Sequence, residues 1–221
     1  MAAQHSSWNF HDWSGSAAAF HALDLGYERA LWLCEVTSPA LILGSSQDVD
    51  VADEEVARAL GIELVKRRSG GGAVFVHPEQ SVWIDITISR DDPLWVDDVS
   101  DSMLWVGESF GKALSPWVDA TVYAGSFESG TCGRSVCFSS SSPGEVFVGD
   151  KKLVGISQRR TREGARFQCV LYSHWDVSQW LPALKSSDSA PLADLVPDIP
   201  VATVAASAHD IAHAVHLALP L

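Results

Sequence analysis

Two short segments of the chain combine basic residues with glycines, and both could contact an anion or a group that develops negative charge. The first, Arg67–Ala73, places three consecutive glycines after two arginines and a serine. Glycine tolerates positive φ and leaves backbone N–H groups uncovered, so this segment can form an anion-binding nest, although a flexible hairpin turn is also possible. The second, Gly149–Arg160, carries Lys151 and Lys152. A fixed ammonium can stabilise negative charge that develops on a carbonyl oxygen.

The basic residues are concentrated in an otherwise acidic chain. Nine of the 15 lysines and arginines fall within Lys66–Arg68, Lys151–Lys152 and Arg159–Arg166, although the formal net charge is −13. A local positive field suits a small anionic ligand or the acidic surface of a partner, and a solvated basic hairpin is the alternative. The overall negative charge opposes binding to nucleic-acid phosphates or anionic membranes. We therefore expect no nucleic-acid partner and no membrane partner.

Length and composition predict one globular domain in a reducing compartment. The 221 residues are 47% hydrophobic, which is enough for a single large core. The 4 cysteines lack paired C-x-x-C spacing, so neither a disulfide framework nor a structural zinc site is expected. His209, His213 and His216 share one helical face, for which a surface helix is favoured over metal ligation. No basic region leads into an apolar run at the start, and we expect a cytoplasmic protein.

Hydrophobic periodicity predicts alternating helices and strands. Helical patterns cover residues 16–36, 53–60, 100–115, 177–184 and 208–219. Asp53 can cap the second of these helices and Gly61 can end it. Extended patterns cover residues 40–43, 62–67, 73–76, 82–88, 146–148, 152–159 and 167–172, the last three as an antiparallel meander. The glycine- and serine-rich stretch 125–144 is the longest candidate loop, and long loops are often functional.

Two motifs in a fixed order give the chain a resemblance to a known family. They are Arg67-Arg68-Ser69-Gly70-Gly71-Gly72-Ala73-Val74-Phe75 and, much later, the lysine segment with its K-x-x-G register, Lys152 to Gly155. Together they resemble the biotin/lipoate protein ligase family, specifically the branch of lipoate-protein ligase A and the lipoyl-octanoyl transferases. The turn Leu43–Gln47 is similar to the family's first pocket motif, so the likeness spans residues 17–180.

The resemblance implies both a fold and a function. The implied fold is α/β (α+β), with a central, largely antiparallel or mixed sheet flanked by helices, as in class II synthetases and the catalytic domains of biotin ligases. We expect residues 1–221 to form one such catalytic domain without a separate C-terminal accessory domain. The implied activity is attachment of an octanoyl or lipoyl group to the lysine amine of lipoyl carrier domains. The implied partners are lipoyl domains of 2-oxoacid dehydrogenases or the glycine cleavage H protein, with acyl carrier protein as a possible donor.

Family motifs also imply roles for particular residues. The essential lysine corresponds to Lys152 in the K-x-x-G register, although spacing alone leaves Lys151 open. Cys137, fifteen residues before Lys152, is similar to the acyl-accepting cysteine of the cysteine-dependent octanoyltransferases, and a small buried hydrophobic residue is the alternative. The remaining residues implied to bind substrate are Gly44, Gln47, Arg67, Arg68, Ser69, Gly70, Gly71, Gly72, Ala73, His77, Gly155 and Ser157.

The choice between a transferase and a ligase depends on where the chain departs from the family pattern. The ligases carry an Asn-Asp pair where this chain has Gly144-Glu145, which favours thioester transfer without a cofactor over ligation with ATP and Mg²⁺. A biotin ligase and a non-catalytic module that binds acyl groups or carrier domains are further alternatives. The family histidine after the Ala-Val-aromatic triplet is replaced by Val76, with His77 one step later. Cys169 stands within the family's Gln-His-Gly motif, so a second cysteine near the site is expected.

Overall fold

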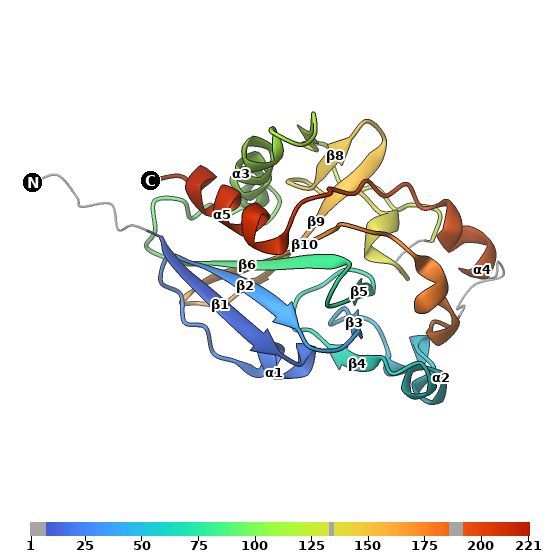
Figure 1. The fold of residues 1–221 in the computed structure, drawn as a ribbon. Coiled ribbons are helices and arrows are strands. Elements are labelled where there is room, and N and C mark those ends of the chain that lie inside the picture. The colour runs from blue at the N-terminus through green and yellow to red at the C-terminus, as the bar shows by residue number, and fades with distance from the viewer. Residues whose placement is uncertain (1–7, 133–134, 186–191) are drawn as a thin grey trace, which may run out of the picture.

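A seven-stranded mixed sheet forms the centre of the molecule in the computed structural model, which describes residues 8–132, 135–185 and 192–221 (Figure 1). Its first two strands pair in parallel and its other neighbouring strands pair antiparallel. In order across the sheet the strands are β1 (Asn9–Gly15), β2 (Ala30–Val36), β6 (Ser81–Ser89), β10 (Gly164–Tyr172), β9 (Lys151–Arg160), β8 (Val146–Val148) and β7 (Thr121–Val122). The predicted mixed α+β architecture and the meander β8–β9–β10 are confirmed.

A smaller sheet lies against one face of the large one. It consists of β4 (Glu63–Lys66), β3 (Ala40–Leu43) and β5 (Val74–Val76), with β3 in the middle. The connection from β3 to β4 contains helix α2 (Glu54–Ala59). Asp53 caps this helix by accepting from the backbone N–H groups of Glu55 and Val56, and Gly61 ends it with a φ of +70°, as predicted.

The two faces of the large sheet carry different layers (Figure 1). Helices α3 (Leu104–Leu114) and α5 (Ala208–Ala218) pack on one face, whose core includes Ile84, Ile86 and Phe167. Helix α1 (Ala17–Ala22) and the small sheet cover the other face, where Trp83 and Val170 lie. Because successive residues of a strand point to opposite faces, β6 and β10 contribute alternate residues to the two layers. The short helix α4 (Leu192–Leu195) lies near the C-terminal end of the chain.

The helix predicted for residues 16–36 is wrong over most of its length. Only α1 is helical, beginning at the N-cap Ser16, and the chain from Ala30 onward is strand β2 in the interior of the sheet. A strand buried on both faces is apolar at nearly every position, so helical spacing can be found in it by chance. The segment 177–184 forms two 3₁₀ turns, Val177–Gln179 and Leu181–Ala183, rather than an α-helix.

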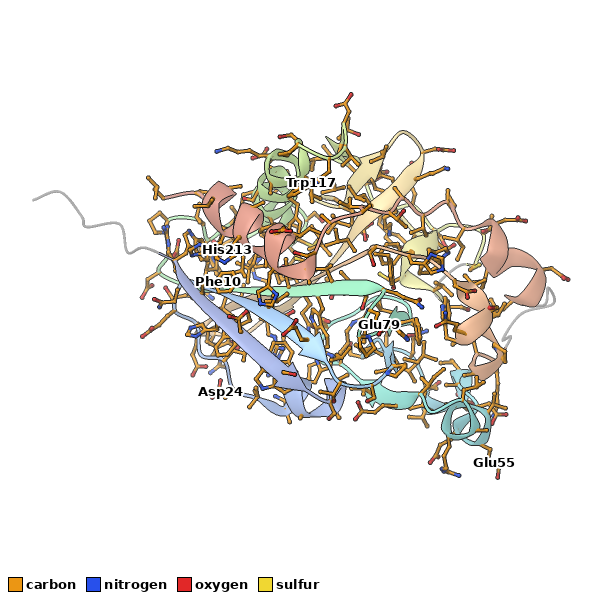
Figure 2. The ribbon with its side chains drawn as sticks, in the orientation of Figure 1. Phe10, Asp24, Glu55, Glu79, Trp117 and His213 are labelled. Carbon is orange, nitrogen blue, oxygen red and sulfur yellow. The ribbon has the colours of Figure 1, made fainter. Side chains whose placement is uncertain are left out.

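The C-terminal histidines pack against the first strand. His213 stacks on Phe10 with ring centroids 4.9 Å apart, and Figure 2 shows the pair between α5 and β1. The Nε2 atom of His216 lies 3.0 Å from the carbonyl oxygen of Trp8. Among the described residues no group of three or more His, Cys, Asp and Glu side chains could hold a metal ion. Within the same residues, no helix has the length and apolarity needed to span a bilayer.

The glycine segment passes directly over the turn after β3. A Cβ atom on Gly44 would collide with the backbone carbonyl of Gly71, whose φ is +99°. The backbone N–H of Ser45 donates to the carbonyl of Ser69 at 2.9 Å. Two segments that are more than twenty residues apart in the sequence are therefore held in backbone contact, which only a residue without a side chain permits at position 44.

We expect Gly44→Ala to lower the free energy of unfolding by about 1–3 kcal/mol, because the new methyl group meets rigid backbone. Gly70→Ala in the same segment is the matched control. A Cβ at position 70 meets nothing within 4 Å, and its effect should stay within about 0.5 kcal/mol. Urea unfolding followed by tryptophan fluorescence measures both, and equal effects would contradict the close approach at Gly44.

Candidate functional site

A narrow pocket lies between the small sheet, α1 and the adjoining face of β9 and β10. Its mostly apolar wall includes Ile42, Val74, Trp83, Phe138, Ile156 and Val170. Polar groups also reach it, from His21, Arg67, Cys137, Ser157 and Gln168. An apolar wall with a few converging polar groups is the usual form of a ligand site. Three of the residues predicted from the sequence to bind substrate, Arg67, Gly155 and Ser157, line this pocket together with Cys137.

Lys152 is buried beside the pocket rather than exposed to water. Its side chain is 1% exposed, and its Nζ atom lies 2.8 Å from a carboxylate oxygen of Glu145. The same Nζ donates to the carbonyl oxygen of Cys137 at 2.9 Å and lies 5.5 Å from the centre of the Phe138 ring. Lys151, the alternative from spacing, is exposed. The ammonium therefore sits next to the backbone of the candidate nucleophile.

A β-bulge places Lys152 on the pocket side of β9. Alternate residues of a regular strand share a face, so Lys152 and Gly155, three positions apart, would point to opposite sides. The pairing of β9 with β8 shifts register here, which leaves one extra residue on β9. Leu153 and Val154 both enter the core under α3 and α5. Lys152 and Gly155 both lie against Phe138, where a Cβ on the glycine would come within 3.0 Å of the ring.

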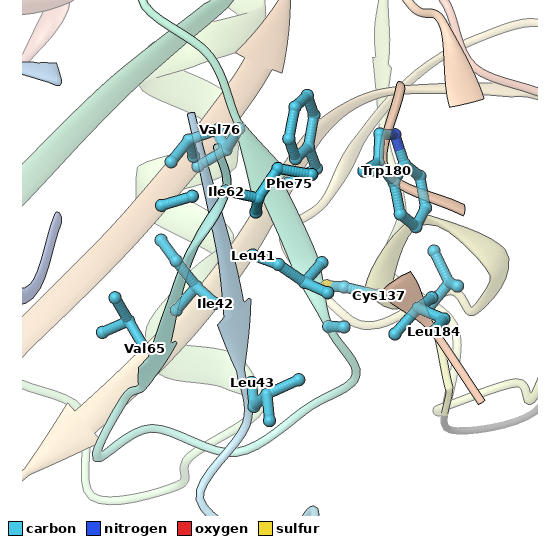
Figure 3. Close-up of a cluster of buried hydrophobic side chains, with 14 of the residues drawn as sticks. Leu41, Ile42, Leu43, Ile62, Val65, Phe75, Val76, Cys137, Trp180 and Leu184 are labelled. Carbon is cyan, nitrogen blue, oxygen red and sulfur yellow. The ribbon is translucent and has the colours of Figure 1, made fainter. Parts of the chain in front are cut away.

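Backbone hydrogen bonds fix the loop that carries Cys137. The N–H of Ala73 donates to the carbonyl of Ser135, and the N–H of Cys137 donates to the carbonyl of Ala73, each at 2.9 Å. The loop thus runs alongside the end of the glycine segment. Figure 3 shows Cys137 among the side chains of the hydrophobic cluster that includes Leu41 and Phe75. The predicted long loop is therefore ordered at its cysteine by the first motif.

Burial dominates the electrostatics of the candidate cysteine. It raises the pKa of the Cys137 thiol, while the positive charges of Lys152 and Arg67 lower this pKa and the charge of Glu145 raises it. The expected effect of Lys152 on the thiol is present, but desolvation outweighs it. Burial also raises the pKa of Glu145, with Lys152 acting in the opposite direction. The thiol is therefore protonated at neutral pH.

The two arginines of the glycine segment have different surroundings. Arg67 is buried, and its guanidinium donates to the carbonyl oxygens of Ile42 at 3.2 Å, Gly70 at 2.7 Å and Gly72 at 2.8 Å. It therefore shapes the glycine segment from inside. Arg68 is exposed. A role for Arg68 at the acyl group stays a prediction.

The remaining predicted residues are not part of the pocket wall, although some of them contact residues that line it. Gln47 joins two segments: its Oε1 accepts from the N–H of Gly44 at 2.9 Å and its Nε2 donates to the carbonyl of Ser135 at 3.2 Å. Ser69 donates to the side chain of Gln168 at 2.7 Å. His77 does not line the pocket. It lies in the turn after β5, where its Nδ1 accepts a hydrogen bond from the backbone N–H of Glu79.

Sequence reasoning missed two side chains and misplaced a third. In the sequence Glu145 stands out only as a departure from the ligase pattern, and its place seven residues before Lys152, across the β8–β9 hairpin, is the one signal of their buried pair. His21 carries no motif that would have marked it. Cys169, expected near the site, is wholly buried on the opposite face of the large sheet, in the core under α3 and α5. It lies there because it alternates with Gln168 and Val170 along β10.

A family model described as "Lipoyl protein ligase A/B catalytic domain" matches residues 12–206. The chain belongs to this family. The family predicted from the two motifs is thereby confirmed, and the match includes both motifs, Cys137 and Glu145.

Individual relatives agree with this assignment. The octanoyltransferase LipM of Moorella thermoacetica is 30% identical over 127 residues, which are 55% of this chain and 45% of that protein. The chain thus spans less than half the length of this curated relative. Among solved structures, the bi-partite lipoate protein ligase of Thermoplasma acidophilum, studied with its E2 lipoyl domain, is 18% identical with a TM-score of 0.70 and coverage of 97% of this chain and 82% of that one. Lipoate-protein ligase A bound with ATP is 17% identical, with a TM-score of 0.67 and coverage of 95% and 83%. At these identities the structures show a shared fold.

We expect Lys152→Met to raise the pKa of the Cys137 thiol and Glu145→Gln to lower it, each by about one pH unit, because the two charges act on the thiol with opposite sign. The pH dependence of alkylation by iodoacetamide, with peptide mapping to assign the cysteine, measures this pKa. Lys151→Met is the matched control and should leave it unchanged. A shift of the same sign in both variants would show that the pair does not act on the thiol electrostatically.

Proposed function

We propose that the chain transfers an octanoyl or lipoyl group to the amine of a specific lysine on lipoyl carrier domains. The observation that carries this proposal is the buried Lys152 ammonium, held 2.9 Å from the carbonyl oxygen of Cys137 beside an apolar pocket. Membership of the family and the likeness to an octanoyltransferase support it. The ligase of similar fold that was studied with its E2 lipoyl domain supports lipoyl domains, including those of 2-oxoacid dehydrogenases, as acceptors. The glycine cleavage H protein is a further proposed acceptor.

The favoured route passes through a thioester on Cys137. In the first step the sulfur of Cys137 forms a bond to the acyl carbon of a carrier thioester and the bond to the carrier sulfur breaks, so the proton of one thiol ends on the other. In the second step the neutral lysine amine of the acceptor attacks the acyl carbon, an amide forms, and the Cys137 thiol is regenerated with the proton that the amine loses. A cysteine nucleophile divides one difficult transfer into two easier ones. No cofactor is required for this route, and acyl carrier protein is the proposed donor.

Within this route the surrounding residues have distinct tasks. In this proposal Lys152 holds the carbonyl oxygen as it becomes negative, and Glu145, 2.8 Å from the ammonium, keeps Lys152 in position. The apolar wall of the pocket excludes water, which would otherwise hydrolyse the thioester. Arg67 keeps the glycine segment folded over the pocket through its three carbonyl contacts. We place the reaction in the cytoplasm, where a reduced thiol persists.

The alternative is a lipoate ligase that uses ATP and Mg²⁺, and a ligase of similar fold has been solved with ATP. The residues present here fit the metal poorly. Glu145 occupies the position of the ligases' Asn-Asp pair, but it is buried and already bound to Lys152, so it is not an open oxygen ligand. Mg²⁺ prefers several carboxylate, phosphate or water oxygens in octahedral geometry. This disagreement favours transfer over ligation.

The proposed route predicts an octanoyl adduct on the protein after mixing with octanoyl acyl carrier protein. Intact-mass analysis should show one added octanoyl group on the wild type and none on Cys137→Ser. Cys169→Ser is the matched control and should keep the adduct, because that thiol lies on the other face of the sheet.

Lipoate-dependent exchange of pyrophosphate into ATP separates the two routes. We expect no exchange by the wild type. Clear exchange, together with an adduct that survives in Cys137→Ser or never forms, would replace the thioester route by the ligase. Failure of both assays with every donor would support a non-catalytic binding module.

A further inference from the structure

His21 lines the pocket, and one of its ring nitrogens is buried without a hydrogen-bond partner among the described residues. It lies in the last turn of α1, and its ring packs 5.0 Å from the ring of Trp83. Its Nε2 atom is buried and has no hydrogen-bond partner within the part of the chain that the structure describes. Buried polar atoms without a partner are uncommon in folded proteins, and each calls for a physical reason. The side chain is also one of the few polar groups in the pocket wall.

The hydrogen-bond network around Gln168 determines which ring nitrogen of His21 carries the hydrogen. The amide oxygen of Gln168 accepts from the Ser69 hydroxyl at 2.7 Å, so the amide nitrogen is on the opposite side. There it donates to Asp85, whose carboxylate also accepts from Trp83 and Arg166. The same amide nitrogen lies 3.4 Å from Nδ1 of His21. Because an amide nitrogen can only donate, Nδ1 accepts and Nε2 carries the hydrogen.

The imidazole is neutral under ordinary conditions. Burial, followed by the nearby positive charges of Arg166 and Arg67, lowers the pKa of His21 to about 3. An uncharged ring with its hydrogen on Nε2 offers one N–H donor to whatever occupies the pocket. The other tautomer of His21, with its hydrogen on Nδ1, would break the contact to Gln168.

Strand β9 indicates where this donor lies relative to the reacting end of an acyl group. Lys152 and Gly155 contact Phe138, beside Cys137. Two residues farther along the strand, Ser157 pairs with Gln168, which contacts His21. A strand advances about 3.3 Å per residue, so His21 is displaced along β9 from the ammonium and the thiol. An acyl group with its carbonyl at Lys152 would extend its tail towards His21.

We propose that His21 is a specificity-determining residue that donates its Nε2–H to an acceptor atom at the tail of the acyl group, and so favours a lipoyl group over an octanoyl group. This inference rests on the proposed function. The dithiolane ring of a lipoyl group carries two sulfurs, which are weak hydrogen-bond acceptors. The methyl end of an octanoyl group accepts nothing and leaves the buried donor unpaired, which carries a desolvation penalty. The pocket therefore distinguishes two acyl groups of equal chain length by the chemistry of their tails.

The test compares lipoyl and octanoyl donors with wild type, His21→Leu and His21→Gln. For His21→Leu we expect the ratio of kcat/KM values, lipoyl over octanoyl, to fall about fivefold, since the apolar side chain removes the donor. His21→Gln retains an N–H donor and should preserve most of the ratio. His209→Leu, the same change on the exposed surface of α5, is the matched control and should leave the ratio unchanged.

Calorimetric binding of free lipoate and free octanoate gives a second readout that does not require transfer. A lower affinity of His21→Leu for lipoate, with octanoate binding unchanged or stronger, supports the inference. If this result is found but no acyl group is transferred, only the proposed function fails. Equal losses for both acids would overturn the inference, because they would show that His21 merely packs against Trp83. An unchanged ratio in both assays would overturn it as well.

Discussion

The ion pair between Lys152 and Glu145 is the constraint on which the site depends. Taking two charges out of water costs several kcal/mol per ion in real proteins, and mutual attraction repays this only when the geometry is good and the remaining hydrogen-bonding capacity is used. Here the ammonium is 2.8 Å from the carboxylate and 2.9 Å from the carbonyl of Cys137, and the backbone N–H of Ser142 donates to Glu145 at 2.8 Å. Such a pair is weak evidence for stability, since apolar replacements are often as stable. The pair lies beside the Cys137 thiol, where its charges can take part in a reaction, and the surrounding loops shield it from water.

A second buried polar group lies at the other end of the pocket. Asp85 is wholly buried and accepts from Arg166 and Trp83, while Gln168 links it to Ser69. This network spans β6, β10 and the glycine segment, so it couples the position of the first motif to the central strands. These buried hydrogen bonds resist displacement, because moving one partner leaves a buried polar group unpaired. The pocket is therefore held at both ends by polar contacts and between them by apolar packing.

The sequence predicted the parts of the fold in which local pattern and tertiary position agree. The strands β6, β9 and β10 alternate in character because one face meets helices and the other meets the pocket, and α2 carries both its cap and its glycine stop. Prediction failed where the environment overrides the pattern: β2 is buried on both faces and lost its alternation. β1, at the edge of the sheet, is largely polar and gave no signal. For the site, motifs located Lys152 and the glycine segment, but no local pattern could show that Arg67 faces inward, that Cys169 faces away, or that α1 brings His21 into the wall.

The bulge in β9 has a consequence for how this lysine can be traced through related chains. Lys152 and Gly155 are an odd number of residues apart. They face the same side of the strand only because the bulge leaves one residue between them unpaired. In a protein whose hairpin is regular, the lysine that meets the aromatic ring would stand an even number of positions before the glycine. Matching lysines by alignment position alone would then select a residue on the opposite face of the strand. The equivalent lysine is identified by the number of residues between it and the glycine, odd or even, together with the pairing of the two strands.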